Sequence, residues 1–508
     1  MTAQAAHKKI IIIGSGFSGL GMAIRLQQKG IHEFLILERA SEVGGTWRDN
    51  TYPGCACDVM SHLYSFSFEP NPDWSRKYSS WKEIGAYLKR CAKKYNLYDK
   101  IRFGQTVRKG RFIEGRSIWE ITSDTGEVFT ADFVVAAPGP LSNPAIPDIP
   151  GKDSFQGQMF HSANWNHDYD LTDKRVAVIG TGASAIQFVP EIAKKVQSLK
   201  LFQRTPPWIL PKPDRKFLGI EKFLFRWLPG YRSLTRSIIY WINEWVLSGL
   251  LKPDSVKGKM YASIAKYHIK KVIKDPELQK KVTPDYSIGC KRILLANSYY
   301  PALNRKHVDV ITDGVERIGE DHIVTRSGET LPVDAIIWGT GFNVTEPLEG
   351  TSIIGMNGVD LNGYWQKNQF ENYYGTMVSG FPNCFMLAGP NTGIGHTSLV
   401  FMIESQINLI LQCIESMEDR DGKALNVRAD AQKQHYDALQ EKSRGTAWTS
   451  GCNSWYLGEN GQNLAIWPDY TFKYWWQTRK MNKDDFQIVS TLSSRGTKRP
   501  KKAKGVTP

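Results

Sequence analysis

Hydrophobic and polar positions along the chain predict strands and helices in alternation. Residues 8–13 form a short run, KKIIII, that is rich in β-branched side chains. The segment GSGFSG follows at residues 14–19, and the next stretch has the amphipathic spacing of a helix before a second hydrophobic run ends at Glu38. This order of strand, glycine-rich turn, helix and strand predicts a βαβ unit, whose turn brings a helix N-terminus to the carboxyl edge of a parallel sheet.

The same order of elements returns in the middle of the chain. A strand is predicted at residues 175–179, followed by GTGASA at 180–185, a helix, and a strand that leads to Arg204. From the first glycine of each turn to the residue that ends the second strand there are 24 positions in both copies. Two such turns in matching context predict two dinucleotide-binding sites. The expected contacts are Gly14, Gly16 and Gly19 in the first turn and Gly180, Gly182 and Ala185 in the second.

A weaker internal repeat indicates how the two units are connected. Residues 124–139 resemble residues 326–341, and each segment predicts a turn followed by a buried strand that ends in glycine. Because the second dinucleotide unit begins before the first domain is finished, we expect one domain to be inserted in the other. A strand at 384–387, within the segment 380–398, marks the expected return to the first domain.

These patterns together predict an α/β protein with two nested Rossmann-like dinucleotide-binding domains and a mainly helical insertion. The expected boundaries are 1–145 and 376–508 for the first domain, 146–211 and 293–375 for the second, and 212–292 for the insertion. Residues from about 493 to 508 are expected to form a disordered basic tail, because their composition cannot bury a core.

The insertion contains an apolar stretch, residues 237–251, that is shorter than the roughly 20 residues of a membrane span and includes Glu244. We therefore expect no stable insertion into a membrane. Two interpretations of the stretch remain open. We favour a helical lid over an apolar substrate channel. Contact with a membrane surface is the alternative, which the nearby Arg226, Arg232 and Arg236 would support.

The composition is that of a globular protein. Over 508 residues, 41% are hydrophobic and 23% are charged, which excludes collagen, coiled coil and whole-chain disorder. Seven cysteines without a CxxC pair predict neither a disulfide framework nor a zinc site, and no metal is expected. Lys8 and Lys9 run directly into a strand rather than into the apolar core of a signal peptide, so we expect a cytoplasmic location.

The formal net charge is +15, which raises the question of a nucleic-acid partner. Six of these charges lie in the predicted tail, and two phosphorylated dinucleotides would require basic grooves in any case. The usual nucleic-acid-binding motifs are absent from the sequence. We therefore expect no nucleic-acid partner.

The residues at the two strand ends predict two different dinucleotides. A carboxylate at Glu38 would accept hydrogen bonds from ribose hydroxyls and would repel a 2′-phosphate. A guanidinium at Arg204 would instead bind that phosphate through two parallel hydrogen bonds, with help from Lys291. The first site is therefore predicted to bind FAD and the second to prefer NADP over NAD.

The segment GGTWRDNTYPGCACD, residues 44–58, resembles a motif of the type I Baeyer–Villiger monooxygenases, which are class B flavin-dependent monooxygenases. The matching residues are Gly44, Gly45, Trp47, Tyr52, Pro53, Gly54 and Asp58. A second family signature resembles FQGQMFHSANWN, in which Phe155, Gly157, His161 and Trp165 match and Asn166 replaces the final Pro or Asp. Related enzymes that oxidise nitrogen and sulfur resemble the same signature with another aromatic residue at the position of Trp165. The resemblance covers nearly the whole chain apart from the tail.

A third segment, GCKR at residues 289–292, resembles the family segment whose arginine reaches over the flavin. The resemblance implies that Arg292 is catalytic, that an ionised Asp58 holds it in place, and that Lys291 helps to bind the NADP phosphate. In the chemistry that it implies, reduced flavin takes up dioxygen to form a peroxyflavin, which attacks a ketone only when deprotonated. A guanidinium suits this task because its permanent charge stabilises an anion without offering an easily lost proton.

Further cofactor contacts are implied by the same resemblance. They are Gly45, Thr46, Trp47, Asp58, Tyr64, Asn391 and Thr392 for FAD, and Arg204, Thr205, Lys291 and Trp455 for NADPH. A place in the aromatic core is the alternative for Trp455. His161 is expected to have a structural or linker role between the domains rather than a catalytic one.

We therefore expect an NADPH- and FAD-dependent Baeyer–Villiger monooxygenase that converts ketones to esters or lactones, with a small-molecule ketone and dioxygen as partners. Oxidation of sulfur or nitrogen is a possible side activity and, as the main reaction of a flavin-containing monooxygenase, the nearest alternative. A membrane-surface flavoprotein reductase is a third alternative. Linear, cyclic and aryl ketones all remain open as substrates, and the sequence specifies no oligomeric state.

Overall fold

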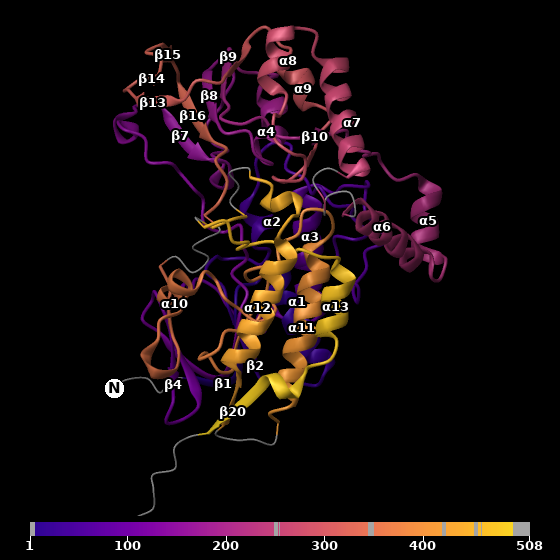
Figure 1. Cartoon of the computed structure of the whole chain (residues 1–508), viewed down its shortest axis with the longest axis vertical. Helices are drawn as coiled ribbons and strands as arrows, with labels where there is room; N and C mark the ends of the chain where they lie inside the picture. Colours follow the sequence, from indigo (N-terminus) through magenta and orange to yellow (C-terminus); the bar gives the residue numbers. More distant parts are fainter. Residues whose placement is uncertain are drawn as a thin grey trace, which may run out of the picture.

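The computed structural model describes residues 6–247, 252, 255–343, 350–418, 423–451, 456–458 and 460–490. The chain folds into two halves, one stacked on the other, and a helical arm that projects from one side between them (Figure 1). Each half is built on its own sheet. The predicted basic tail, residues 493–508, lies outside the described residues.

The first half contains an eight-stranded sheet in the order β17-β4-β5-β6-β1-β2-β3, with β18 paired beside β6. The strands are β1 (Ala6–Ile13), β2 (Phe34–Leu37), β3 (Ile101–Arg102), β4 (Val107–Ile113), β5 (Ile118–Ser123), β6 (Val128–Ala136), β17 (Ser352–Ile354) and β18 (Cys384–Met386). Strands β6, β1, β2 and β3 run parallel. Ile10, Ile11 and Ile12 of β1 are fully buried, as expected for a central parallel strand that is covered on both faces.

Four helices of the first half pack against one another, and α1 packs on β1 of its sheet (Figure 1). They are α1 (Phe17–Gln28), α3 (Trp81–Lys94), α11 (Leu399–Glu415) and α13 (Thr471–Thr478). The remaining elements of this half include α2 (Thr46–Asp49), α10 (Leu361–Asn368), α12 (Ala429–Ser443), β19 (Lys423–Val427) and β20 (Phe486–Ser490).

The second half contains a five-stranded parallel sheet in the order β12-β9-β8-β16-β7. Its strands are β7 (Gln158–His161), β8 (Arg175–Ile179), β9 (Ser198–Phe202), β12 (Val308–Ile311) and β16 (Ala335–Trp338). Helices α4 (Ala185–Ile192) and α9 (Tyr299–Leu303) belong to this half. A small antiparallel sheet is formed by β13 (Val315–Ile318), β14 (His322–Thr325) and β15 (Thr330–Pro332).

The two sheets are nested along the chain, because β17 and β18 of the first sheet follow β16 of the second. The predicted fold class is confirmed. One boundary is wrong: β17 pairs in parallel with β4, so residues 352–354 already belong to the first sheet, although the sequence placed the return at residue 376. The pairing of a three-residue strand at a sheet edge depends on which strand lies beside it in space. Its hydrophobic pattern is too short to predict that partner.

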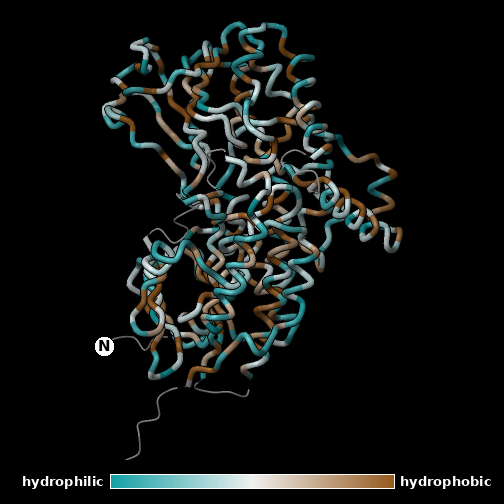
Figure 2. The backbone as a smooth tube through the Cα atoms, in the orientation of Figure 1, coloured by the Kyte–Doolittle hydropathy of each residue, from teal (hydrophilic) through white to brown (hydrophobic). Residues whose placement is uncertain are grey.

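The predicted insertion is helical and its ends meet. Strand β10 (Ile209–Leu210) before it pairs with β11 (Leu294–Leu295) after it. Between them lie α5 (Gly219–Trp227), α6 (Tyr231–Leu247), α7 (Val256–Val272) and α8 (Pro276–Val282). Helices α7 and α8 lie beside the second half, whereas α5 and α6 form the projecting arm, which carries hydrophobic stretches along its length (Figures 1 and 2). Every helix in the described residues is too short or too polar to cross a bilayer.

Candidate active site between two dinucleotide sites

The first glycine turn lies between β1 and α1. Gly14 has a φ of +100°, and a Cβ built there would lie 2.5 Å from the carbonyl oxygen of Ala137, so the turn requires glycine. Gly45 approaches Gly16 so closely that a Cβ on Gly45 would lie 3.1 Å from the Gly16 Cα. Within the described residues, α1 begins at Phe17 without a side-chain cap. Its first N–H groups and its positive end therefore suit the phosphates of a dinucleotide.

Glu38 follows β2, and its side chain is buried beside this turn. One carboxylate oxygen accepts from the backbone N–H and the hydroxyl of Ser15, at 2.8 and 2.6 Å. The other accepts from the Ala40 N–H at 3.0 Å and from Arg48 Nη1 at 2.9 Å. These bonds occupy about four acceptor positions, the usual capacity of a carboxylate. A ribose hydroxyl would therefore have to replace one of the present donors.

The second glycine turn has the same design. Gly180 has a φ of +106°, and its Cβ would lie 2.4 Å from the carbonyl oxygen of Gly339. Gly182 has more room, because a Cβ there would meet the same oxygen at 3.7 Å. Helix α4 begins at the buried Ala185, again without a side-chain cap among the described residues and with no acidic residue in its first turn. This helix start also suits a phosphate group.

Two cations stand beside the second turn. Arg204 is exposed just beyond the end of β9, and the hydroxyl of Thr181 in the turn donates to the Thr205 carbonyl at 3.3 Å. Burial lowers the pKa of Lys291, and the positive charge of Arg204 lowers it further, against the opposing charge of Asp285. In the described part of the chain, no ion pair joins either cation to a carboxylate. The pair is therefore suited to a polyanionic group such as a phosphate monoester.

Arg292 and Asp58 form a two-pronged ion pair where the halves meet. Arg292 Nε donates to Asp58 Oδ2 at 3.1 Å, and Nη2 donates to Oδ1 and Oδ2 at 2.9 and 2.8 Å. Nη1 lies 3.5 Å from the carbonyl oxygen of Ile394, in the glycine-rich turn before α11. The contacts bring together a loop of the first half, the end of the insertion and the returning C-terminal segment.

Both members of this pair are charged. The carboxylate of Asp58 raises the pKa of Arg292, against the opposing effect of burial. Burial alone would raise the pKa of Asp58, but the charge and hydrogen bonds of Arg292 outweigh it, and Lys212 adds to them, so the pKa lies below its usual value. The Lys212 ammonium also donates to the Cys57 carbonyl at 3.0 Å. The sequence had not singled out Lys212, which lies at the start of the insertion.

A small hollow adjoins the Arg292 guanidinium. Its lining residues are Gly289, Lys291, Arg292, Ile293, Gly395, His396, Trp448 and Tyr456. Burial raises the pKa of the Tyr456 phenol to about 12, so the phenol stays protonated at neutral pH. His396 Nε2 lies 3.5 Å from Glu244 Oε1, and both side chains are buried. The hollow thus connects the predicted catalytic arginine with a predicted NADP ligand and, through Glu244, with α6. The sequence reasoning missed His396, Trp448 and Tyr456, whose roles depend on tertiary contacts.

The aromatic residues expected near FAD contact each other. Trp47 Nε1 donates to the Tyr64 hydroxyl at 3.1 Å, and the rings meet edge to face with centroids 5.5 Å apart. Thr46 is the first residue of α2, directly after Gly45. This places the predicted residues beside the first glycine turn, since Gly45 packs on Gly16.

The residues predicted from the C-terminal turn use their side chains within the protein. Asn391 is buried with a φ of +60°, and its amide nitrogen donates to the Asn463 carbonyl at 2.7 Å. The Thr392 hydroxyl donates to the Gly389 carbonyl at 2.6 Å. Any contact of these residues with a flavin would therefore come from their backbone. Trp455 lies outside the described residues.

Gln187 of α4 joins the family motif to the second half. Its side-chain oxygen accepts from the Tyr52 hydroxyl at 3.0 Å, and its nitrogen donates to the Ala56 carbonyl at 2.9 Å. Gly54 has a φ of +80°, and a Cβ there would lie 2.6 Å from the Gln187 carbonyl oxygen. Two matched positions of the motif, Tyr52 and Gly54, thus serve the contact between the halves together with Ala56, and Gln187 is a partner that the sequence did not identify.

His161 has the surroundings of a structural histidine. Its Nδ1 accepts from the Ala163 N–H at 3.1 Å, burial lowers its pKa, and its ring meets that of Phe342 edge to face. It ends β7, beside β16. Trp165 packs against Phe188 of α4 with ring centroids 5.3 Å apart. These contacts tie the signature to the sheet and helix of the second half.

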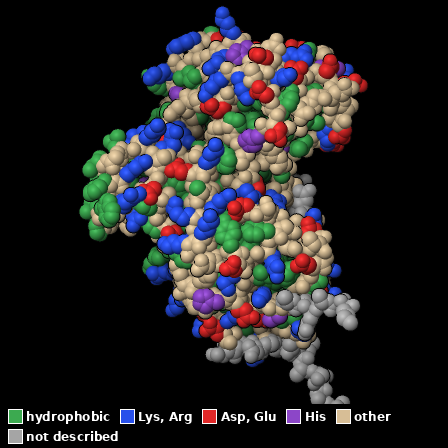
Figure 3. All heavy atoms as spheres, turned by 180° about the vertical axis from the view of Figure 1, so that it is seen from behind, with side chains coloured by type: hydrophobic (Ala, Val, Ile, Leu, Met, Phe, Trp, Pro, Cys, Tyr) green, Lys and Arg blue, Asp and Glu red, His purple; other side chains and the backbone are tan. Residues whose placement is uncertain are grey.

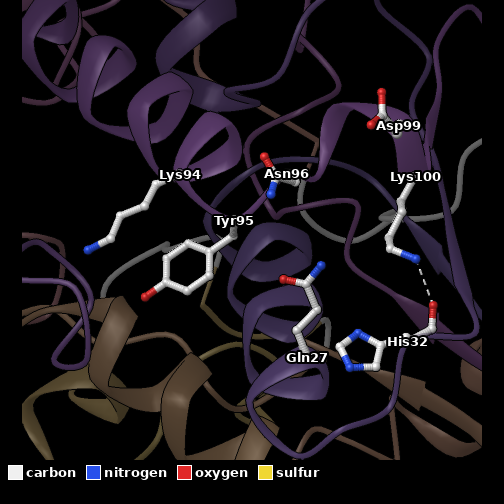
Figure 4. A pocket seen from close by; sticks show the side chains of 7 residues that line it. All are labelled: Gln27, His32, Lys94, Tyr95, Asn96, Asp99 and Lys100. Carbon is white, nitrogen blue, oxygen red and sulfur yellow. Dashed lines mark hydrogen bonds between the residues drawn. The ribbon is translucent and has the colours of Figure 1, made fainter.

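A larger open hollow, about 650 Å³, lies elsewhere on the first half (Figure 4). It is lined by Gln27, His32, Lys94, Tyr95, Asn96, Asp99 and Lys100. The Lys94 ammonium is bound by Glu69 at 2.8 Å, and the Lys100 ammonium donates to the His32 carbonyl at 2.8 Å. Gln27 is near the C-terminal end of α1, so this hollow is at the opposite end of the helix from the glycine turn. Its position and its occupied cations argue against a dinucleotide site.

One expectation about the cysteines is wrong. Cys290, next to Lys291, is disulfide-bonded, although the cysteine spacing predicted no disulfide framework. Proximity in the fold decides which cysteines pair, and spacing along the chain does not report it. Cys55, Cys57, Cys91, Cys384 and Cys413 are free thiols.

Comparison with known proteins gives matches over almost the full length. Residues 11–217 match a family model described as pyridine nucleotide-disulphide oxidoreductase. The chain is 47% identical over 507 residues to a Baeyer-Villiger monooxygenase from Pseudomonas aeruginosa, across 99% of this chain and 96% of that protein.

Solved structures give the same result. A cyclohexanone monooxygenase from Rhodococcus sp. Phi1 bound to NADP+ superposes with a TM-score of 0.86 at 27% identity, covering 96% of this chain and 100% of that one. The OTEMO complex with FAD and NADP superposes with a TM-score of 0.84 at 27% identity, with the same coverage. The likeness therefore includes both halves and the junction between them.

Proposed function

The chain belongs to the Baeyer–Villiger monooxygenases, and from this membership we propose how its own residues serve the reaction. It is an NADPH- and FAD-dependent enzyme that converts ketones to esters or lactones with dioxygen. The predicted family, fold and cofactors are confirmed. The roles of individual residues and the domain limits remain proposals, and so does the identity of the ketone.

The first site fits FAD. The glycine turn leaves room for a pyrophosphate beside the α1 N-terminus, and the buried carboxylate of Glu38 stands where an adenosine ribose would meet the end of β2. Trp47 and Tyr64 lie on the same side, through the contact of Gly45 with Gly16. These residues would hold the flavin dinucleotide.

The second site fits NADPH. Its glycine turn and the α4 N-terminus repeat the first design, but the strand end carries Arg204 in place of a carboxylate. Lys291 places a second cation near Arg204 and at the rim of the hollow beside Arg292. Both cations would bind the 2′-phosphate, which distinguishes NADP from NAD.

When bound and reduced by NADPH, the flavin supplies the electrons that activate dioxygen. Arg292 provides a fixed positive charge for the negative oxygen that attacks the ketone. Two of its nitrogens, Nε and Nη2, are committed to Asp58, while Nη1 makes one long contact with Ile394 in the described part of the chain. Nη1 is therefore the nitrogen available to a reacting oxygen. Because the pKa of Arg292 is raised, its guanidinium keeps its proton at neutral pH.

Asp58 and Lys212 would act as positioning residues. The carboxylate holds the Arg292 fork in one orientation and remains ionised because its pKa is lowered. Lys212 supports the loop through the Cys57 carbonyl and adds positive charge beside Asp58. Because a carboxylate and a guanidinium from different segments must meet here, the pair forms only when the two halves and the insertion are assembled.

The single observation that carries this proposal is the two-pronged contact of Arg292 with Asp58 at the junction of the halves. To test the reaction, the purified protein would be examined for flavin absorbance and for NADPH oxidation with linear, cyclic and aryl ketones, with products identified. We expect a yellow protein that forms ester or lactone in step with NADPH use. A colourless protein, or NADPH oxidation without any oxygenated ketone product, would contradict the proposal.

Oxidation of sulfur or nitrogen stays an untested prediction, and a thioether included in the same panel measures it. A cytoplasmic location also stays a proposal. The five free thiols agree with a reducing compartment, and the disulfide at Cys290 is the exception.

A further inference from the structure

The outer surface of the helical arm is apolar, and the proposed reaction does not use it. In the described part of the chain, ten of the 21 exposed large hydrophobic residues lie between positions 218 and 245. We call them the apolar arm surface: Leu218, Ile220, Phe223, Trp227, Leu228, Leu234, Ile238, Trp241, Ile242 and Trp245, each 50–68% exposed. A concentration of this kind on one projection marks an interaction site rather than ordinary surface.

Helix α6 turns its apolar face to solvent and its polar face toward the protein, the reverse of an ordinary surface helix. The exposed residues Leu234, Ile238, Trp241, Ile242 and Trp245 follow helical spacing along its outward face. The opposite face turns Arg236, Tyr240 and Glu244 toward the protein. Arg236 Nη1 donates to the His62 carbonyl at 2.9 Å, and Thr471 bonds both the Tyr240 hydroxyl, at 3.0 Å, and the Glu244 carboxylate. A helix that buries its charged groups and exposes tryptophan needs a partner for its outer face.

Tryptophans of α13 extend the same surface. Trp241 of α6 contacts Phe472, with ring centroids 5.8 Å apart. Trp475 and Trp476 follow Phe472 by three and four positions, which is the same helix face, and they are 44% and 58% exposed. Tryptophan has an apolar ring with a polar N–H and is enriched where hydrocarbon meets polar headgroups.

The charges that border the apolar arm surface are basic. Within the described residues, Lys222 forms no ion pair. The arm carboxylates are neutralised or hidden, since Glu221 accepts two hydrogen bonds of 2.7 Å from Arg215 and Glu244 is buried. Figure 3 shows hydrophobic side chains covering the projection, with Lys and Arg and a few Asp and Glu side chains around them. A second copy docked on the same surface would bring these cations together, whereas anionic headgroups would complement them.

We propose that the apolar arm surface docks on an anionic lipid bilayer as a peripheral contact. Helices α5 and α6 would lie along the interface, with the tryptophans and branched side chains at the boundary of headgroups and acyl chains. Lys222 would meet the lipid phosphates. The contact needs no membrane-spanning helix.

Vesicle flotation of the full-length, FAD-loaded protein tests this directly. Vesicles of phosphatidylcholine with and without phosphatidylglycerol would be compared at low and high salt. We expect flotation with the anionic vesicles, weakened by salt. The double variant Ile238→Ser, Trp241→Ser should reduce the partition coefficient at least about tenfold. The variant Lys222→Glu should reduce it at least about fivefold, with the anionic vesicles only.

The matched control is Ile146→Ser, Val359→Ser, which removes two side chains that are 48% and 42% exposed and lie outside the arm. All variants must retain the parental flavin absorbance and melting temperature, which reports an intact fold. Flotation that survives the arm substitutions would overturn the proposal and assign lipid binding to another part of the chain. Absence of flotation together with a dimer that the Ile238, Trp241 variant converts to monomer would overturn it in favour of a second copy.

Discussion

The two dinucleotide sites share a backbone design and differ in the charge at the strand end. In both, a glycine with a φ near +100° closes the turn against a carbonyl oxygen, and an uncapped helix begins behind it. At the first site the strand ends in Glu38, which is buried and bonded to Ser15. At the second it ends in Arg204, which is exposed beside Lys291.

This difference separates two contributions: the fold provides the phosphate site, and a single side chain would set which dinucleotide binds. The turn and the helix provide a phosphate site in either half, whatever dinucleotide binds. We propose that the side chain at the strand end then distinguishes a ribose with free hydroxyls from one that carries a 2′-phosphate. Substitutions in the turns should therefore weaken binding of the whole dinucleotide, whereas substitutions at the strand ends should change selectivity.

The largest effect is expected from alanine in the turns. Gly14→Ala forces a side chain into a left-handed backbone and against the Ala137 carbonyl, so we expect loss of most bound FAD. Gly180→Ala meets the Gly339 carbonyl in the same way, but it should leave FAD bound and raise the KM for NADPH. The ratio of flavin to protein absorbance and the KM for NADPH measure the two outcomes.

Gly115→Ala is the matched control for the turn variants, because a Cβ there meets no described atom within 4 Å. It should change neither flavin content nor KM. If Gly180→Ala lost FAD as readily as Gly14→Ala does, the conclusion that the two turns bind different dinucleotides would be contradicted.

The next largest effect is expected at the second strand end. Arg204→Glu removes a phosphate ligand and adds repulsion, so the KM for NADPH should rise at least about thirtyfold, equivalent to about 2 kcal/mol. The KM for NADH should change much less, because NADH lacks the 2′-phosphate. Steady-state kinetics with both nucleotides measure the difference. Arg317→Glu, on the exposed side of β13, is the charge-matched control, and equal effects on NADPH and NADH would argue against the assignment.

Lys291→Ala should have a smaller effect in the same direction. We expect the KM for NADPH to rise about fivefold, as for one charge-assisted contact of about 1 kcal/mol. Because burial and Arg204 lower the pKa of Lys291, its ammonium loses its proton below the ordinary value of 10.5. The parental KM for NADPH should therefore rise as the pH approaches that value. If the KM of Lys291→Ala for NADPH rose with pH in the same way as that of the parent, deprotonation of Lys291 would be excluded as the cause of the rise.

The smallest effect concerns the ion pair that joins the two sites. The pKa of Asp58 is lowered from 3.8 in the folded protein, so its contribution to stability is fully present above that pH and is lost as the pH falls through the lowered pKa. The melting temperature of the parent should exceed that of Asp58→Asn by a constant margin above about pH 4 and by less below it. Thermal unfolding followed by flavin fluorescence across acidic pH measures the margin. A margin that does not shrink in acid would show that the pair is not the source of the difference.

Local patterns in the sequence predict much of the fold. The strand expected at residues 175–179 is β8, because four consecutive β-branched or small apolar residues, 176–179, before a glycine turn leave few alternatives. The glycines were predictable for the same reason, since a positive φ and a close approach demand glycine locally. Strand β17 was not, because its pairing with β4 depends on a neighbour more than 200 residues away.

The site was predictable where one motif contains the residue and not where it depends on assembly. Asp58 and Arg292 could be proposed from their motifs, but Gln187, Lys212 and His396 acquire partners only through tertiary contacts. The sequence also did not indicate that α6 turns its apolar face outward. Its apolar stripe has ordinary helical spacing, which normally points toward the core.

The yield of ester per NADPH oxidised in Arg292→Ala tests the central claim most directly. The parent should convert most of the NADPH it oxidises into ester or lactone. Arg292→Ala should keep its flavin and still oxidise NADPH, but its yield of ester should fall about a hundredfold or more, because no fixed charge stabilises the attacking oxygen. Oxidation of a thioether by the same variant controls for general damage. A parental ester yield in Arg292→Ala would contradict the account.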